Sequence, residues 1–296
     1  MFPSERPSVS AHATSVDLGT YRVWISRSDL TADVATEIER LGYGAIWIGG
    51  SPGAGLGEVS TALAATSRIA VATGVVNIWS ADAATVADSF HRIESRFPGR
   101  FLLGIGAGHR EANGSQAARP FGAVVDYLDV LDARGVPQDR RVIAALGPRM
   151  LRLSAERAAG SHPYLVTPVF ARTAREGLGD RPLLAPEHKV ALGRTPERTR
   201  KVGRRALRPY LDAGLVNYLS NLRRLGFTDA DFDEGGSDTL VDALVAQGDP
   251  ESAAAELRAY LEAGADHVPV QPLSEDGGLL SVLARLAPAL GLEPRG

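Results

Sequence analysis

Short apolar runs alternate with longer amphipathic segments from residue 21 almost to the end of the chain. The runs are rich in β-branched residues, which is typical of buried strands, and the segments between them repeat apolar positions at helical spacing. We predict strands at 21–26, 45–48, 69–76, 101–105, 141–146, 163–166, within 183–192 and at 267–271. Helices are predicted at 32–41, 58–67, 84–97, 119–133, 150–159, from 167, from 195 towards 208, at 250–261 and at 279–290.

The stretch from 69 to 109 shows the repeating unit most clearly. One run ends in Asn77, a helix follows, and the next run ends in Gly106-Ala107-Gly108-His109. The helical part is long enough for a crossover between parallel strands. Repeated along the chain, this unit predicts an α/β fold, an eight-stranded (β/α)8 TIM barrel, with an open doubly wound sheet as the weaker alternative. No GxGxxG opens a helix after the first strand, which argues against a Rossmann site.

Two segments depart from this rhythm. Residues 1–18 lack the apolar region of a secretory signal and are expected to form a flexible leader, before one domain over 19–296. Residues 208–249 are interpreted as helices packed beside the barrel between strands seven and eight.

Composition and charge exclude several classes of protein. A net charge of −3 without a basic stripe argues against nucleic acid as a partner. The absence of cysteine excludes disulfides, thiolate zinc sites and a cysteine nucleophile. No apolar run approaches the roughly 18 residues of a membrane span, so we expect a cytoplasmic protein without a membrane partner. The histidines show neither HxH nor HExxH spacing, so no metal site is expected, and no GxSxG elbow indicates a hydrolase.

The carboxyl ends of the strands are the expected place for chemistry. Glycine and alanine dominate several of these ends, which leaves room for a flat ligand against the backbone. Gly147 and the helix after it offer amide donors for a phosphate. Arg149 and Arg152 are nearby, and each is either a cation for that phosphate or, as is more common, a plain surface charge. Asn77 either bonds a ligand carbonyl or caps its own turn. Glu187 is interpreted as an inward polar residue satisfied by hydrogen bonds.

The run ATGVVNIWSADAATVADSFHRIESRFPGRFLLGIGAGH, residues 72–109, resembles the luciferase-like monooxygenase superfamily. Within it, the run is similar to the oxidoreductases that depend on the deazaflavin coenzyme F420. The signature is TGVxN at strand three, followed one helix later by PGRFxLGxGxG. The stretches at 162–168, 183–192, 217–227, 235–249 and 263–271 resemble one subfamily of these oxidoreductases, so the resemblance covers the chain from Tyr21 onward.

The resemblance implies a TIM barrel that holds a deazaflavin or a flavin at the carboxyl ends of its strands. It also implies a cis peptide bond between Gly74 and Val75, placed against the cofactor ring. Backbone amides of the glycine loop at 106–108 would approach the ring edge. The cofactor-binding residues expected are Thr73, Gly74, Val75, Asn77, Gly106, Ala107, Gly108, Ala145, Gly147 and Thr167.

His109 and His162 are the expected catalytic residues. Related sugar-phosphate dehydrogenases carry an acidic residue where this chain has His109, and a histidine where it has Gly49-Gly50-Ser51, which argues against a sugar-phosphate substrate. A histidine titrates near neutrality, so His109 is either a proton donor or acceptor beside hydride transfer or a loop residue that bonds the cofactor. His162 either faces the barrel mouth or is a buried structural histidine.

The function implied by the resemblance is hydride transfer between reduced F420 and a small organic substrate. One alternative is an FMN-dependent monooxygenase, acting with O2 and with a separate reductase as partner. Another is a non-catalytic protein that binds a flavin or a deazaflavin. Barrels of this family often pair through their outer helices, so a homodimer is expected.

Overall fold

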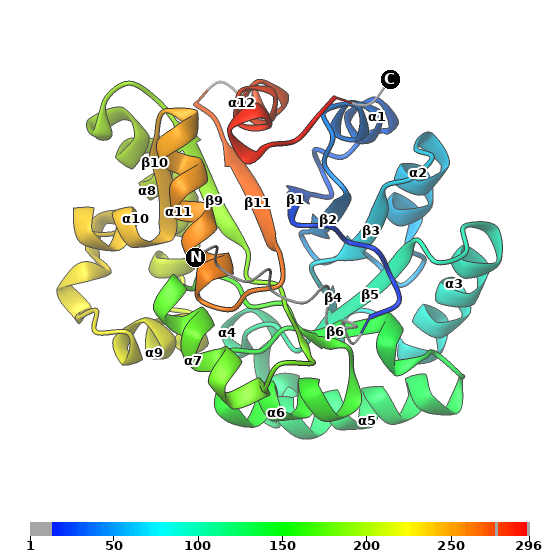
Figure 1. Ribbon diagram of the computed structural model, residues 1–296. Helices are drawn as coiled ribbons and strands as arrows, with labels where there is room; N and C mark the ends of the chain where they lie inside the picture. Colours follow the sequence, from blue (N-terminus) through cyan, green and yellow to red (C-terminus); the bar gives the residue numbers. More distant parts are fainter. Residues whose placement is uncertain (1–13, 276–277, 295–296) are drawn as a thin grey trace, which may run out of the picture.

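The predicted strands curl into a ring of parallel strands with helices around the outside (Figure 1). The computed structural model describes residues 14–275 and 278–294. Its strands are β1 (Tyr21–Ser26), β2 (Ala45–Gly49), β3 (Ala70–Thr73), β4 (Val76–Asn77), β5 (Phe101–Gly106), β6 (Arg141–Ile143), β7 (Gly160–Ser161), β8 (Leu183–Leu184), β9 (His188–Leu192), β10 (Val245–Gly248) and β11 (Val268–Leu273).

Several of the helices between the strands begin at a side-chain cap. The side chains of Thr31, Asp82, Ser237 and Asp249 each accept a hydrogen bond from a backbone N–H of the first turn. The helices are α1 (Ala32–Arg40), α2 (Gly57–Ala65), α3 (Ala83–Arg96), α4 (Arg110–Asn113), α5 (Pro120–Ala133), α6 (Pro148–Arg157), α7 (Pro168–Leu178), α8 (Pro196–Asp212), α9 (Val216–Arg224), α10 (Asp238–Leu244), α11 (Pro250–Glu262) and α12 (Leu279–Leu286).

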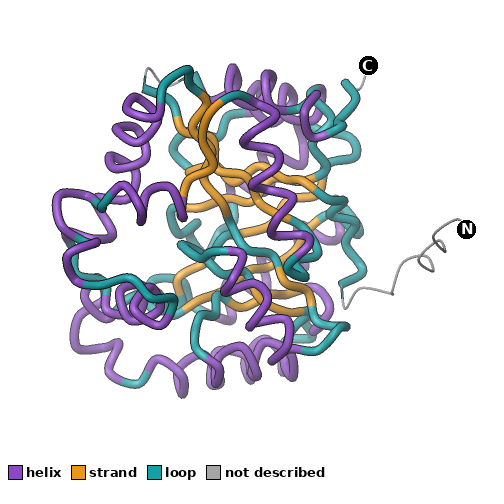
Figure 2. The backbone as a smooth tube through the Cα atoms, turned by 60° about the vertical axis from the view of Figure 1, so that its left-hand side comes forward, coloured by secondary structure: helices purple, strands orange, loops and turns teal. Residues whose placement is uncertain are grey.

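The order of hydrogen-bonded strands is β10-β9-β11-β1-β2-β3-β5-β6-β7-β8, with β4 also paired to β5. The ring closes through the stretch 183–192. Its first part, β8, pairs with β7, and its second part, β9, pairs with β11. β10 pairs with β9 as well, beside the barrel wall. Figure 2 shows the strands gathered inside a shell of helices, which confirms the predicted TIM barrel.

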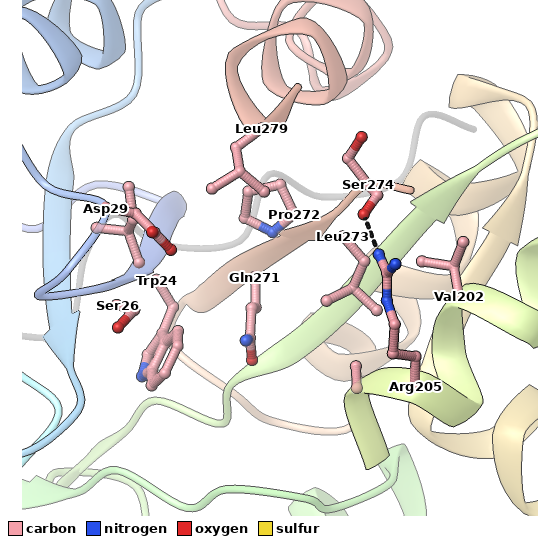
Figure 3. A pocket seen from close by; sticks show the side chains of 12 residues that line it. Trp24, Ser26, Asp29, Val202, Arg205, Gln271, Pro272, Leu273, Ser274 and Leu279 are labelled. Atoms are coloured by element: carbon pink, nitrogen blue, oxygen red, sulfur yellow. Dashed lines mark hydrogen bonds between the residues drawn. The ribbon is translucent and has the colours of Figure 1, made fainter. Parts of the chain in front are cut away.

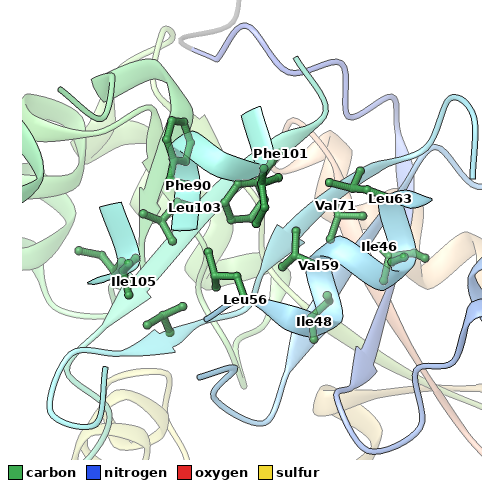
Figure 4. Close-up of a cluster of buried hydrophobic side chains, with 14 of the residues drawn as sticks. Ile46, Ile48, Leu56, Val59, Leu63, Val71, Phe90, Phe101, Leu103 and Ile105 are labelled. Atoms are coloured by element: carbon green, nitrogen blue, oxygen red, sulfur yellow. The ribbon is translucent and has the colours of Figure 1, made fainter. Parts of the chain in front are cut away.

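Alternate residues of each strand face two different apolar layers. Ile46, Ile48 and Val71 point outward and pack with Val59 and Leu63 of α2, as Figure 4 shows. Their neighbours Ala45, Trp47 and Ala72 belong to a separate cluster inside the ring. Residues 1–13 of the predicted leader lie outside the described residues. Its last residues are part of the fold, because Val16 and Leu18 are buried in that inner cluster.

Several predicted boundaries were wrong. The strand expected at 163–166 lies earlier, at β7, because Pro163 has no N–H to continue the ladder and Leu165 has a left-handed φ of 53°. The strand expected over 69–76 is divided into β3 and β4 at the bond between Gly74 and Val75. The strand expected at 141–146 ends at Ile143.

The segment 208–249 also differs in part from its prediction. It contains helices, as expected, and stands at the left of the barrel in Figure 1. Its end, however, is the strand β10 and not a helix, because β9 offers an open edge to which residues 245–248 pair. In the described part of the chain, no helix has both the length and the apolar character needed to cross a membrane.

Candidate active site

A cavity of about 720 Å³ opens at the carboxyl ends of the strands. Ser26, Gly50 and Gln271, which lie at the ends of β1, β2 and β11, form one side of it. Ala144 and Gly147 follow β6 on the opposite side of the ring. The cavity therefore lies where the strand ends were expected to hold a ligand.

The floor of the cavity is built from very small residues. A Cβ added at Gly106 would lie 2.9 Å from Val75 Cγ2 and 3.0 Å from Ala144 Cβ, so no side chain fits there without displacing the floor. Gly74 and Val75 line the cavity, and the peptide bond between them is cis. The cis bond implied by the resemblance is therefore confirmed. This floor leaves a flat surface of backbone and short side chains.

Six of the ten expected cofactor-binding residues line the cavity, namely Gly74, Val75, Ala107, Gly108, Ala145 and Gly147. The other four are outside its lining, and three of them use their side chains locally. Thr73 Oγ1 donates to the Gly104 carbonyl at 2.8 Å, and Thr167 Oγ1 accepts from the Phe170 N–H and so caps α7. Asn77 Oδ1 accepts from the backbone of Trp79, which is the turn-capping role. Gly106 lies beneath Val75, as described above.

His109 stands on the cavity wall at the start of α4. Its ring centre is 4.2 Å from that of Tyr218, which comes from α9 in the segment 208–249. Its Nδ1 is buried and has no hydrogen-bond partner among the described residues. Burial lowers the pKa of His109, although nearby Glu111 opposes that shift. A histidine in this state is neutral at pH 7 and can accept or donate one proton at a ligand.

His162 also lines the cavity, but its state differs from that of His109. The ring is 2% exposed, is stacked 4.1 Å from Trp47, and places Nδ1 2.7 Å from the Ala185 carbonyl oxygen. Because a carbonyl oxygen only accepts, Nδ1 carries the hydrogen and Nε2 presents a lone pair. Burial lowers the pKa of His162 to about 4. At neutral pH this side chain is therefore a hydrogen-bond acceptor, not an acid.

A polar cluster beneath the mouth was not expected from the sequence beyond Glu187. Lys189 Nζ lies 3.1 Å from Glu187 Oε1 and 3.9 Å from the ring centre of Tyr164. The Tyr164 hydroxyl donates to Gln271 Oε1 at 2.9 Å and accepts from the Tyr210 hydroxyl, also at 2.9 Å. The predicted satisfaction of Glu187 by hydrogen bonds is confirmed. Tyr210 and Tyr218 were not predicted as site residues. In the sequence they are two tyrosines on predicted helices of the segment 208–249, and no local pattern places them at the site.

The charge of the cavity is positive. The described residues that line it include Arg149 and Arg224 and no carboxylate. The guanidinium of Arg149 lies 3.6 Å above the ring centre of Phe121, which holds it at the cavity wall beside Gly147. Arg152, the other cation expected there, is exposed and outside the lining. The arrangement suits a flat ligand with an anionic substituent.

Comparison with known proteins agrees with this geometry. The luciferase-like monooxygenase family matches residues 9–267, and the chain belongs to that family, whose members are oxidoreductases. No protein with a curated function matched the sequence.

Solved structures share the fold at low sequence identity. An F420-dependent secondary alcohol dehydrogenase in complex with an F420-acetone adduct is 14% identical, with a TM-score of 0.71 over 92% of this chain and 98% of that one. The coenzyme F420-dependent tetrahydromethanopterin reductase from Methanopyrus kandleri is 14% identical, with a TM-score of 0.67 over 93% and 99%. The oxygenating constituent of 3,6-diketocamphane monooxygenase from Pseudomonas putida, in complex with FMN, is 14% identical, with a TM-score of 0.61 over 91% and 99%. At these identities the likeness shows the fold alone.

Proposed function

We propose that this chain is an oxidoreductase that binds coenzyme F420 in the cavity and transfers hydride between the reduced cofactor and a small organic substrate. The observation that carries the proposal is the cavity itself. It combines a floor of small residues and backbone, aromatic walls, and two arginines, with no carboxylate among the described residues of its lining. Two neighbours that share this barrel are named for F420, and a third is in complex with FMN, so the fold suits a cofactor of this kind.

The residues present fit a tricyclic ring with a phosphate-bearing side chain. The ring would lie on the floor formed by Val75 and Ala144. Gly106 packs directly beneath this floor, and there is no space there for a Cβ. Arg149 and the amides that follow Gly147 would hold the phosphate, since both are at the start of α6. When bound, a reduced deazaflavin supplies a hydride equivalent, and the protein supplies position and electrostatics.

The protein's own groups divide the remaining work. His109 faces the cavity, and burial lowers its pKa. When the substrate gives up hydride, His109 would accept the proton that the substrate releases, and in the reverse direction it would return that proton to the substrate. His162 Nε2 would accept a hydrogen bond from the bound ligand, because it has no partner among the described residues. Tyr218 and Tyr210 close one side of the cavity and so limit the access of water.

The proposal is tested by titrating the purified protein in parallel with F420 and with FMN, followed by fluorescence. Tight binding of F420 and not of FMN is the expected result. Binding of neither cofactor at micromolar concentrations would exclude the proposal. Preference for FMN, together with oxygen consumption in the presence of a flavin reductase, would favour the monooxygenase alternative.

The role of His109 is tested once a substrate has been found by anaerobic screening of F420 absorbance. His109→Ala is expected to lower kcat without changing F420 affinity by more than a few-fold. His91→Ala, on the outside of α3 where His91 Nε2 contacts the Arg134 carbonyl, serves as the control and should leave kcat unchanged. Binding of F420 without any substrate-dependent redox change would indicate the non-catalytic alternative.

A further inference from the structure

Two further cavities continue the site along helix α8. The first, of about 220 Å³, shares Trp24, Ser26 and Gln271 with the active-site cavity. The second, of about 400 Å³, shares Val202 and Arg205 with the first. The two cavities therefore adjoin the active-site cavity at the carboxyl ends of the paired strands β1 and β11, on the side of α8. We refer to these two cavities together as the α8 passage.

The inner part of the α8 passage is lined by seven apolar and five polar or charged residues. Pro272, Leu273 and Leu279 line it from one side and Val202 of α8 from another, as Figure 3 shows. Asp29 is its carboxylate, and it lies across the cavity from Arg205 in Figure 3. The apolar part of these walls favours a hydrocarbon segment, because apolar surface removed from water contributes roughly 25 cal/mol per Å².

The outer end of the α8 passage is cationic. Lys201, Arg205 and Arg208 are exposed and share one face of α8, since their spacing is i, i+4 and i+7. Arg204 lines this end as well, paired with Asp238, and among the described residues of the lining Glu275 is the one carboxylate. The chain as a whole has a net charge of −3, so this concentration of cations runs against the overall balance.

Two of these cations contact backbone carbonyl groups and make no ion pair with a described carboxylate. Arg205 donates to the backbone carbonyl oxygens of Ser274 at 2.6 Å and Glu275 at 3.5 Å, and Arg208 donates to the carbonyl oxygen of Glu234 at 3.1 Å. Carbonyl oxygens fix the direction of a guanidinium but do not neutralise it. Lys201, by contrast, is 3.2 Å from Glu275 Oε1, and Arg198 contacts Oε2 of the same carboxylate at 2.9 Å. The two arginines therefore remain available to an anion.

The position of the passage separates it from the expected phosphate site. In a ring of eight parallel strands, β1 and β11 lie across the barrel from β6, after which Gly147 and Arg149 stand. A cofactor anchored at Gly147 and Arg149 leaves the α8 passage to the other reactant. We propose that the substrate has an aliphatic chain that ends in a carboxylate or a phosphate, with the chain in the inner passage and the anion at Arg205 and Arg208. This inference rests on the proposed function, because it assumes that the cofactor occupies the active-site cavity.

The test uses octanoate, 1-octanol and octylammonium as probes on the full chain without cofactor, by calorimetric titration at low ionic strength. Octanoate is expected to bind about tenfold more tightly than octanol, because the contact with arginine is charge-assisted, and octylammonium more weakly than either. Raising the salt concentration should reduce the preference, since the cations are exposed. Equal affinities for octanoate and octanol in the wild type would overturn the proposal.

Variants locate the anion. Arg205→Gln with Arg208→Gln should abolish the preference for octanoate, whereas Arg205→Lys keeps a cation and should retain it. The control is Arg68→Gln, an exposed arginine just before β3 at the opposite end of the barrel, which should leave the preference unchanged. A preference that survives the double substitution would overturn the proposal.

A further measurement distinguishes two possible sources of the anion at Arg205 and Arg208, the substrate and the cofactor. The double variant should bind F420 as the wild type does. If it lost F420 affinity by tenfold or more while its preference for octanoate persisted, the passage would belong to the cofactor and the proposal would be wrong. Failure of the wild type to bind F420 or FMN would instead contradict the proposed function, without bearing on the octanoate result.

Discussion

Lys189 Nζ lies 3.1 Å from Glu187 Oε1, and each of the two side chains is about 1% exposed. Burial raises the pKa of Glu187 and lowers the pKa of Lys189, while the charge of each partner opposes the shift of the other. The backbone N–H of Leu165 also donates to the Glu187 carboxylate. The two residues are therefore interdependent, since neither charge has water as an alternative partner.

Removing only the cation of this pair should destabilise the fold strongly. Lys189→Met leaves the Glu187 carboxylate buried without its cation, which typically costs about 3–5 kcal/mol. Adding Glu187→Gln should restore much of the loss. The measurement is the free energy of unfolding in urea, with Lys201→Met as the control, because Lys201 is exposed and surface pairs contribute little. A loss no larger than that of the control would show that the pair is not structural.

Acidification should destabilise the protein through His162. The pKa of this histidine is about 4 in the folded chain, against about 6.5 when unfolded, because of burial. Its contribution to the free energy of unfolding is therefore fully present above pH 6.5. That contribution, on the order of 3 kcal/mol, is lost as the pH falls towards 4. His162→Phe keeps a ring against Trp47 and removes this term. The wild type should lose more unfolding free energy than the variant between pH 7 and pH 4, and parallel pH curves would refute the assignment.

Glu256 on α11 should destabilise the fold as the pH rises, which is opposite to the effect of His162. Burial raises its pKa to about 7, and nearby Asp242 adds to the shift, while the Gln247 N–H at 3.3 Å opposes it. Its contribution is present below the unfolded pKa of about 4.5 and is lost as the pH rises to 7. Glu256→Gln should therefore stabilise the fold at pH 8 by about 1 kcal/mol, a value discounted because the group is partly exposed. Thermal unfolding at pH 8 and pH 4.5 tests this, with the exposed Glu176→Gln of α7 as the control that should show no such difference.

Gly106→Ala should weaken cofactor binding by deforming the floor of the site. The new Cβ would lie 2.9 Å from Val75 and 3.0 Å from Ala144, so Val75 must move into the cavity. We expect at least a tenfold rise in the Kd for the cofactor and a loss of stability of about 1–3 kcal/mol, as for other overpacked sites. Gly122→Ala in α5 meets no atom within 4 Å and should stabilise the fold by up to about 1 kcal/mol with unchanged Kd. Unchanged cofactor affinity in Gly106→Ala would place the ligand elsewhere.

The barrel and the place of its site follow from local patterns. The strands at 45–48 and 101–105 could be predicted from a β-rich apolar run between turn residues. The glycines that end each strand stand in the same stretch of sequence. The helix that begins at Pro168 was expected because Thr167 and a proline at the first position favour a helix start. The glycine loop at 106–108 was expected at the cavity because it stands at the carboxyl end of a predicted strand. Ala107 and Gly108 line the cavity, and Gly106 lies beneath the lining.

Only the tertiary structure decided which distant groups meet. Tyr164 bonds Gln271, which is 107 positions away, and Tyr210, which is 46 away, and no local pattern encodes either pairing. The stretch 183–192 divides into β8 and β9 because its two parts have different neighbours, β7 and β11. Residues 245–248 continue a helical pattern in sequence and nevertheless form β10, because the edge of β9 supplies partners for their backbone. Local pattern set the periodicity of each element, and long-range hydrogen bonding and burial set its limits and the composition of the site.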